Sequence, residues 1–327
     1  MASVNPSADF DGWLPIRLAL GDAGWRVDWC WFGAQRLTRP AFRDDVDVAL
    51  RLPFNQGLRR DTDVQALLDW QARSPGLAPG VLLFHASRCG STLLAQMLAG
   101  LERNAVLAEA PPLDHLLRAH LRDPRAATWQ PHAVEALLSA YGQRRGGEVR
   151  QLVVKLDAWN VFDAPLLSAL YPETPRLFLY RDPLEIVVSR LRQPALHRVA
   201  GAFGPSVLDR LLPDAQGMSA LEFNCRMIGE ILRAGVELCR DHGGIAVNYC
   251  ELPGAVWGRL ASDLGVTPED VARLEAIAVF DAKQPGAPFT ANTQRKREQA
   301  DEEVQAAVRR WAWEPYAALE AIRLSRA

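Results

Sequence analysis

The sequence has no apolar run long enough to cross a membrane as a helix. Its longest apolar stretches, such as Val81–Phe84 and Leu177–Tyr180, have the length of a strand, whereas a spanning helix needs about 20 residues. The first residues, Met1–Trp13, have no positively charged segment followed by an apolar one, which a secretory signal would require. We therefore expect a cytoplasmic protein with no membrane span.

Cysteine is scarce, and the numbers of positively and negatively charged residues are nearly equal. The 327 residues include five cysteines, an odd number, and none of them forms a Cys-x-x-Cys pair. This pattern argues against both a disulfide framework and a thiolate zinc site. The formal net charge is −2, so no overall positive field favours a nucleic-acid polymer as partner. The six histidines have no spacing typical of a metal site, and we expect no metal.

From about residue 80 onward, short apolar runs alternate with stretches long enough to be crossover helices, a pattern that predicts parallel strands covered on both faces. We expect an α/β protein with a three-layer α/β/α domain over residues 80–327 and a mainly parallel central sheet. The predicted strands are Val81–His85, Asn104–Glu109, Gln151–Lys155, Arg176–Tyr180 and Gly244–Tyr249.

Residues 1–79 differ in composition from the rest and are rich in tryptophan and arginine. Alternation of apolar and polar residues predicts strands over 25–33 and 44–54, and helical spacing predicts a helix over 62–74. We interpret this part as a small N-terminal extension packed on the larger domain.

A row of small and polar residues separates the first predicted strand of the large domain from the helix that follows it. The backbone N–H groups of such a turn, together with the helix N-terminus, form a cradle for an anion. A nucleotide-hydrolysing loop has a lysine directly after its last glycine, but here the glycine is followed by serine and the cation lies two residues before it. The residues of this turn are Ser87, Arg88, Cys89, Gly90, Ser91 and Thr92.

A second polar cluster follows the strand Arg176–Tyr180. Asp182 is a good helix N-cap and Pro183 suits the first helical position. Arg181 and Ser189 could then present a guanidinium and a hydroxyl to one phosphate group. Alternatively, Arg181 could be an ion-pair partner of Glu185 or Asp182.

These two segments, "SRCGSTLL" and "LFLYRDPLEIVVSRLRQ", resemble the 5'-phosphosulfate loop and the 3'-phosphate element of sulfotransferases that use 3'-phosphoadenosine 5'-phosphosulfate (PAPS). The resemblance is to the bacterial and tyrosylprotein-type branch and covers residue 80 onward. It implies a P-loop-like fold, PAPS as co-substrate, 3',5'-ADP as product and no metal. Cys89 stands where the family usually has serine, and the usual proline before the loop is absent.

The family also implies roles for later residues. "GGIAVNYCELPG" is similar to its late strand, which would place Tyr249 near the adenine. "FDAKQPGAPFTANTQRKRE" resembles its closing basic loop, so that Arg295, Lys296 or Arg297 could cover the 3'-phosphate. A charge run of this kind could equally be a solvated loop.

Sulfuryl transfer requires stabilisation of charge at the leaving group and a base for the acceptor's proton. Arg88 is the candidate for the first role. Glu109 resembles the base of the tyrosylprotein-type branch, and Asp157 matches by position the base-bearing stretch of the cytosolic branch. Each carboxylate could instead cap a helix or form a salt bridge, and Lys155 could contact the sulfonate or orient the acceptor.

The acceptor, expected to offer a hydroxyl or an amine, is not identified by the sequence. Residues 111–132 and 193–217 could form its pocket or a peripheral helical layer. Two alternatives to a sulfotransferase stay open, namely an ATP-dependent P-loop phosphotransferase and a nucleotide-binding protein without catalytic activity.

Overall fold

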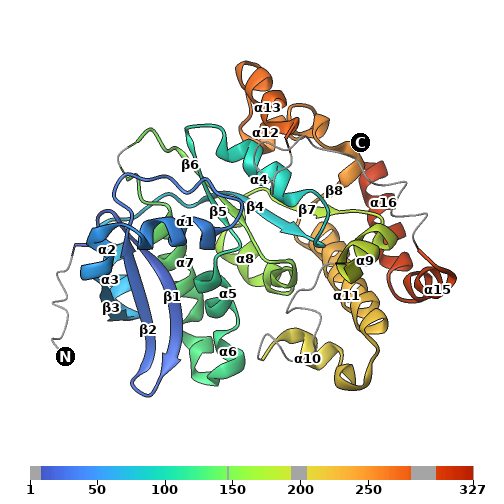
Figure 1. Ribbon diagram of the computed structural model, residues 1–327, viewed down its shortest axis with the longest axis horizontal. Helices are drawn as coiled ribbons and strands as arrows, with labels where there is room; N and C mark the ends of the chain where they lie inside the picture. Colours follow the sequence, from blue (N-terminus) through green and yellow to red (C-terminus); the bar gives the residue numbers. More distant parts are fainter. Residues whose placement is uncertain (1–8, 146, 193–204, 281–299, 327) are drawn as a thin grey trace. The chain divides into compact units, whose positions relative to one another are not determined.

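The computed structural model describes residues 9–145, 147–192, 205–280 and 300–326 (Figure 1). The chain divides into two compact units that interleave along the sequence. The first unit comprises Met1–Leu82, Ala95–Leu156 and Ala169–Thr174, and the second comprises Leu83–Leu94, Asp157–Ser168 and Pro175–Ala327. This grouping follows contacts within the chain, and the division at residue 79 based on composition stays a prediction.

A five-stranded sheet with the order β5-β6-β4-β7-β8 confirms the predicted α/β class. Strand β5 pairs parallel with β6, and β7 pairs parallel with β8. All five predicted strands are present, with shifts of one or two residues at their ends. Their bounds are β4 Pro79–His85, β5 Asn104–Ala108, β6 Gln151–Lys155, β7 Arg176–Tyr180 and β8 Ile245–Asn248.

The strands are correctly predicted because the residues in the middle of each form an uninterrupted apolar run. Val81, Leu82, Leu83 and Phe84 of β4 are all fully buried, as expected for a strand covered on both faces. Each residue of this kind contributes about 1.5–3 kcal/mol when its side chain leaves water.

The first unit contains a separate antiparallel sheet with the order β1-β2-β3. Strand β1 covers Trp13–Gly21, β2 covers Gly24–Trp31 and β3 covers Arg60–Asp63. Helix α3, Gln65–Arg73, lies inside the helix predicted over 62–74. The other helices of this unit are α1 Phe42–Leu50, α2 Pro53–Gly57, α5 Pro111–Leu117, α6 Ala119–Arg122, η1 Pro124–Thr128 and α7 Gln130–Tyr141.

The strand predicted over 44–54 is wrong, because helix α1 occupies most of it. Its buried residues are Phe42, Asp45, Val46 and Ala49, which recur at the three- and four-residue intervals of a helix face rather than at intervals of two. The Asp44 carboxylate accepts a hydrogen bond from the Ala41 N–H at 3.3 Å, and this contact fixes the start of the helix.

Most helices that bear on the site belong to the second unit. Helices α9 (Pro183–Arg192), α11 (Ala220–Asp241) and α15 (Glu302–Trp311) lie side by side (Figure 1). They share an apolar cluster that includes Val187, Cys225 and Val304. The helices that follow β4 and β6 are α4 Ser91–Ala99, η2 Ala158–Asp163 and α8 Ala164–Leu170. Those that follow β7 are α9 Pro183–Arg192, α10 Val207–Leu211, η4 Ala215–Gly217 and α11 Ala220–Asp241. Those that follow β8 are η5 Tyr249–Glu251, η6 Gly254–Val256, α12 Ala261–Leu264, η7 Pro268–Asp270, α13 Val271–Ala278, α15 Glu302–Trp311 and α16 Trp313–Ser325.

Candidate functional site

The loop between β4 and α4 has an unusual backbone. Ser87, Arg88 and Gly90 have φ values of 66°, 51° and 85°, so three of four successive residues lie in the left-handed region. Such a conformation costs a residue other than glycine about 1–3 kcal/mol and persists only where its surroundings enforce it. Ser91 and Thr92, the last two residues of the predicted cradle, form the first turn of α4.

Strand β7 supports this loop from one side. The Leu179 carbonyl accepts hydrogen bonds from the Ala86 N–H at 2.9 Å and from the Cys89 thiol at 3.1 Å. Cys89 is fully buried, so its side chain anchors the loop.

His85 fixes the start of the loop. Its Nδ1 accepts a hydrogen bond from the Ser87 N–H at 3.0 Å, which requires Nδ1 to carry no proton. This N–H therefore points back toward β4. His85 is buried, and the sequence did not reveal this contact.

Tyr249 connects the loop to the second predicted phosphate element. A Cβ atom placed on Gly90 would lie 2.9 Å from Cδ2 of the Tyr249 ring, so the ring lies directly against the glycine. The Arg181 guanidinium lies over the same ring, 4.0 Å from its centre, as in a cation–π contact. The structure thus brings Gly90, Tyr249 and Arg181 together in the second unit, while the expected contact of Tyr249 with adenine stays a prediction.

The start of helix α9 confirms the predicted cap. The Asp182 carboxylate accepts a hydrogen bond from the Leu184 N–H at 2.9 Å, which satisfies one of the open donors of the first turn. The Glu185 carboxylate accepts a hydrogen bond from Arg181 Nε at 2.5 Å, and both side chains of this ion pair are buried. Ser189 lies two turns along the same helix and is partly buried.

The structure adds Arg190, a residue that the sequence analysis missed. Its guanidinium is buried and its Nη1 lies 3.5 Å from Ser87 Oγ in the loop. Its Nε donates to the side-chain oxygen of Asn224 at 2.8 Å. The sequence contains a signal for this residue, because Arg190 follows Ile186 by four positions and therefore lies on the apolar face of the helix.

Two of the predicted catalytic residues form an ion pair in the first unit. Lys155 Nζ lies 2.6 Å from Glu109 Oε1, with the lysine buried and the Glu109 side chain 32% exposed. Glu109 has a φ of 51°, and its N–H donates to the Lys155 carbonyl at 2.8 Å. The carboxylate is thus held at the end of β5 by both backbone and side chain.

Asp157 has a different setting. It is the N-cap residue of η2 in the second unit, and its N–H donates to the side-chain oxygen of Asn160 at 3.1 Å. This bond is made by the backbone of Asp157, and the role of its carboxylate stays a prediction. Arg295, Lys296 and Arg297 lie outside the described residues, so their expected contact with the 3'-phosphate stays a prediction.

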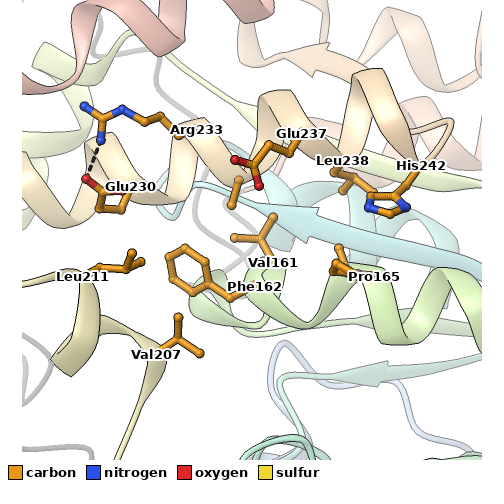
Figure 2. A pocket seen from close by; sticks show the side chains of 12 residues that line it. Val161, Phe162, Pro165, Val207, Leu211, Glu230, Arg233, Glu237, Leu238 and His242 are labelled. Carbon is orange, nitrogen blue, oxygen red and sulfur yellow. Dashed lines mark hydrogen bonds and ion pairs between the residues drawn. The ribbon is translucent and has the colours of Figure 1, made fainter.

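A pocket of about 220 Å³ lies along helix α11 in the second unit. Figure 2 shows Val161 and Phe162 facing the side of α11 that carries Glu237 and Leu238. Val207 and Leu211 come from the described part of the segment 193–217, for which an acceptor pocket was one expectation. At about 1.5 Å per residue, Glu237 lies roughly 15 Å along the helix from Met227, which contacts Arg190 at 3.9 Å. Glu230, which lines the other end of the pocket, lies only about 4.5 Å along the helix from Met227, so the pocket runs along α11 from near this point.

In the described part of the chain, no three histidine, cysteine or acidic side chains form a possible metal site. Among the same residues, no helix is long and apolar enough to span a membrane.

Comparison with known proteins adds a likeness at the level of the fold. No family model and no curated protein matches the chain. Solved sulfotransferases are similar to it in fold. One from Mycobacterium avium has 15% identity and a TM-score of 0.43 over 76% of this chain and 80% of its own. Another from Alicyclobacillus acidocaldarius has 13% identity and a TM-score of 0.43 over 76% of this chain and 96% of its own.

A sulfotransferase domain from a Synechococcus olefin synthase has 20% identity and a TM-score of 0.39 over 76% of this chain and 95% of its own. The descriptions of all three name the class of enzyme that the two sequence motifs resemble. Because the identities and TM-scores are this low, the neighbours show a similar fold alone. The assignment of a function depends on the residues of this chain.

Proposed function

We propose that this protein is a sulfotransferase that transfers a sulfuryl group from PAPS to a hydroxyl or an amine of an acceptor. One observation carries the proposal. In the second unit, Tyr249 contacts both the glycine of the strained loop and the arginine of the second phosphate element. The two segments that resemble the donor-binding elements of the family therefore belong to one cluster of side chains.

The residues of the loop fit the 5' end of such a donor. The Cβ of any other residue in place of Gly90 would meet Tyr249 and Leu252 at 2.9 Å, so the loop is closely packed at this point. Arg88 and the hydroxyls of Ser91 and Thr92 are donors suited to an anion. A sulfuryl group carries less charge than a terminal phosphoryl group, which agrees with a loop that lacks the lysine of nucleotide hydrolases.

Arg181 fits the 3' end. Its Nε and Nη2 both contact Glu185, and Tyr249 lies under its plane. These contacts hold the planar guanidinium in one orientation, and a pre-oriented arginine loses little freedom when it binds a phosphate. We assign Ser189 to the same end.

When bound, PAPS supplies an activated sulfuryl group, and its transfer leaves 3',5'-ADP. We assign to Arg88 the stabilisation of the charge that develops on the leaving group. Glu109 is the proposed base for the acceptor's proton, and Lys155, at 2.6 Å, holds its carboxylate in place. Asp157 is the competing candidate for this role.

A thermal-shift titration with 3',5'-ADP and with ATP, each with and without Mg²⁺, tests the proposal. We expect 3',5'-ADP to stabilise the protein without metal, by about 2.7 kcal/mol at 100 times its Kd. The Arg181→Ala variant should lose most of this gain, whereas Arg192→Ala, an exposed arginine of the same helix, should keep it.

Stabilisation by Mg²⁺–ATP in preference to 3',5'-ADP would favour the phosphotransferase instead. Tight binding of 3',5'-ADP with no turnover of PAPS against a panel of acceptors would indicate a binding protein.

A further inference from the structure

Arg190 is a buried cation that lies against the strained loop. Its side chain projects from α9 between α11 and the loop, with Met227 on one side and Ser87 on the other. Burial of a guanidinium is costly unless its donors find acceptors and its charge is balanced. Asn224 and Met227 lie against this guanidinium from α11, and Ser87 lies against it from the loop.

The neighbouring residues fix where this guanidinium points. Arg190 Nε donates to Asn224 Oδ1 at 2.8 Å. Asn224 is fully buried, and its own NH₂ group donates to the Ala220 carbonyl at 2.7 Å, which determines the orientation of the amide. The amide therefore holds the Nε edge of the guanidinium, while Nη1 lies 3.5 Å from Ser87 Oγ.

Nucleotide-hydrolysing loops neutralise their phosphates with a lysine and a metal ion. The loop of this chain has serine after Gly90, and its own cation, Arg88, is a single charge. Arg190 places a second positive charge at the loop although it comes from a helix about 100 residues later in the chain. This arrangement would replace the missing lysine.

We propose that Arg190 is an anion-binding residue of the cradle, which contacts the 5' group of the bound nucleotide next to Ser87. This inference rests on the proposed function and adds to it a cation to which the sequence motifs assigned no role. Arg190 and Arg88 serve the 5' end of the ligand, and Arg181 serves the 3' end.

A purely structural role for Arg190, as a link between α9, α11 and the loop, makes a different prediction. Loss of such a link would loosen the whole second unit and weaken ligands of every kind. Loss of a direct contact would weaken only ligands that carry a 5' group.

Isothermal titration with adenosine 5'-monophosphate, adenosine 3'-monophosphate and 3',5'-ADP separates the two roles. In Arg190→Met we expect affinity for the two 5'-phosphorylated ligands to fall about 10- to 100-fold, as for the loss of one charge-assisted contact. Affinity for the 3'-monophosphate should stay within about twofold of wild type. Arg190→Lys should recover part of the loss, and Arg192→Met is the matched control on the same helix.

If Arg190→Met fails to fold, Asn224→Ala provides the second test, because it removes the oxygen that orients Arg190 and keeps the charge. It should weaken the 5'-phosphorylated ligands selectively and to a smaller extent. Equal weakening of all three ligands, or no weakening, would overturn the inference while leaving the proposed function intact. If the wild-type protein binds none of the three, both are wrong.

Discussion

Three residues other than glycine have positive φ in the described part of the chain, and all three are predicted site residues. Ser87 and Arg88 lie in the loop after β4, and Glu109 ends β5. Strained backbone of this kind is concentrated at functional sites, because only function justifies its cost. The sequence indicated these residues by motif and position, and the backbone indicates them independently.

Glu109 supplies a prediction at this scale. Glu109→Gln should leave affinity for 3',5'-ADP unchanged, because the residue is not assigned to the donor, and should lower turnover of PAPS about 10²- to 10⁴-fold by removing the base. Measurement of kcat together with the Kd for 3',5'-ADP checks both parts.

Asp157→Asn is the matched carboxylate-to-amide control and should keep turnover within a few-fold, since an asparagine also caps a helix. Loss of turnover in Asp157→Asn with normal turnover in Glu109→Gln would transfer the role of base to Asp157.

Single residues were predicted from the sequence where a local rule applied. Asp182 follows the preference of helix N-termini, and the structure confirms its cap. The partners of Arg181 were left open between an ion pair and a phosphate, and the structure shows the ion pair with Glu185. The spacing of Arg190 from Ile186 indicates its place on the apolar face of α9, but its contact with Ser87 could not be predicted, because it joins residues 103 positions apart.

At the scale of the element, prediction succeeded where one signal acted alone. The central residues of the five strands of the large sheet are apolar and buried, and no competing periodicity occurs in them. The prediction for helix α1 failed because apolar and polar residues alternate over the first part of "DDVDVALRLPF", which is the pattern of a strand. The buried positions of the helix show the helical intervals of three and four residues, but one of them, Asp45, is charged and so does not belong to the apolar pattern.

The loop after β4 is the element on which the site depends, and Gly90→Ala tests it. The variant must place a Cβ atom 2.9 Å from both Tyr249 and Leu252 at a φ of 85°, which alanine adopts only with strain. We expect binding of 3',5'-ADP to fall by about 10-fold or more, as for the loss of one or more hydrogen bonds to a charged group.

Gly254→Ala is the control for this substitution. In the described part of the chain, a Cβ placed at Gly254 would meet no heavy atom within 4 Å beyond its own helical turn. This variant should bind 3',5'-ADP like the wild type. Normal binding by Gly90→Ala would show that the close contact with Tyr249 has no part in the nucleotide site.

At the scale of the whole molecule, the predicted site residues separate into two groups. The first unit holds Glu109 and Lys155, and the second holds the loop, Arg181, Ser189 and Tyr249. Composition changes only once along the chain, near residue 80. It therefore could not reveal two units that each consist of three separate segments of the chain. The assignment of donor binding to the second unit depends on contacts that only a folded chain displays.

The central claim is that the loop and Arg181 bind opposite ends of one nucleotide, and the relative affinities of three ligands test it most directly. Two linked phosphate contacts should reinforce each other. In isothermal titration of the wild-type protein without metal, we predict that 3',5'-ADP binds at least about 100-fold more tightly than either adenosine monophosphate, as expected when a second charge-assisted contact is added. An affinity for 3',5'-ADP equal to that for adenosine 5'-monophosphate would contradict the claim.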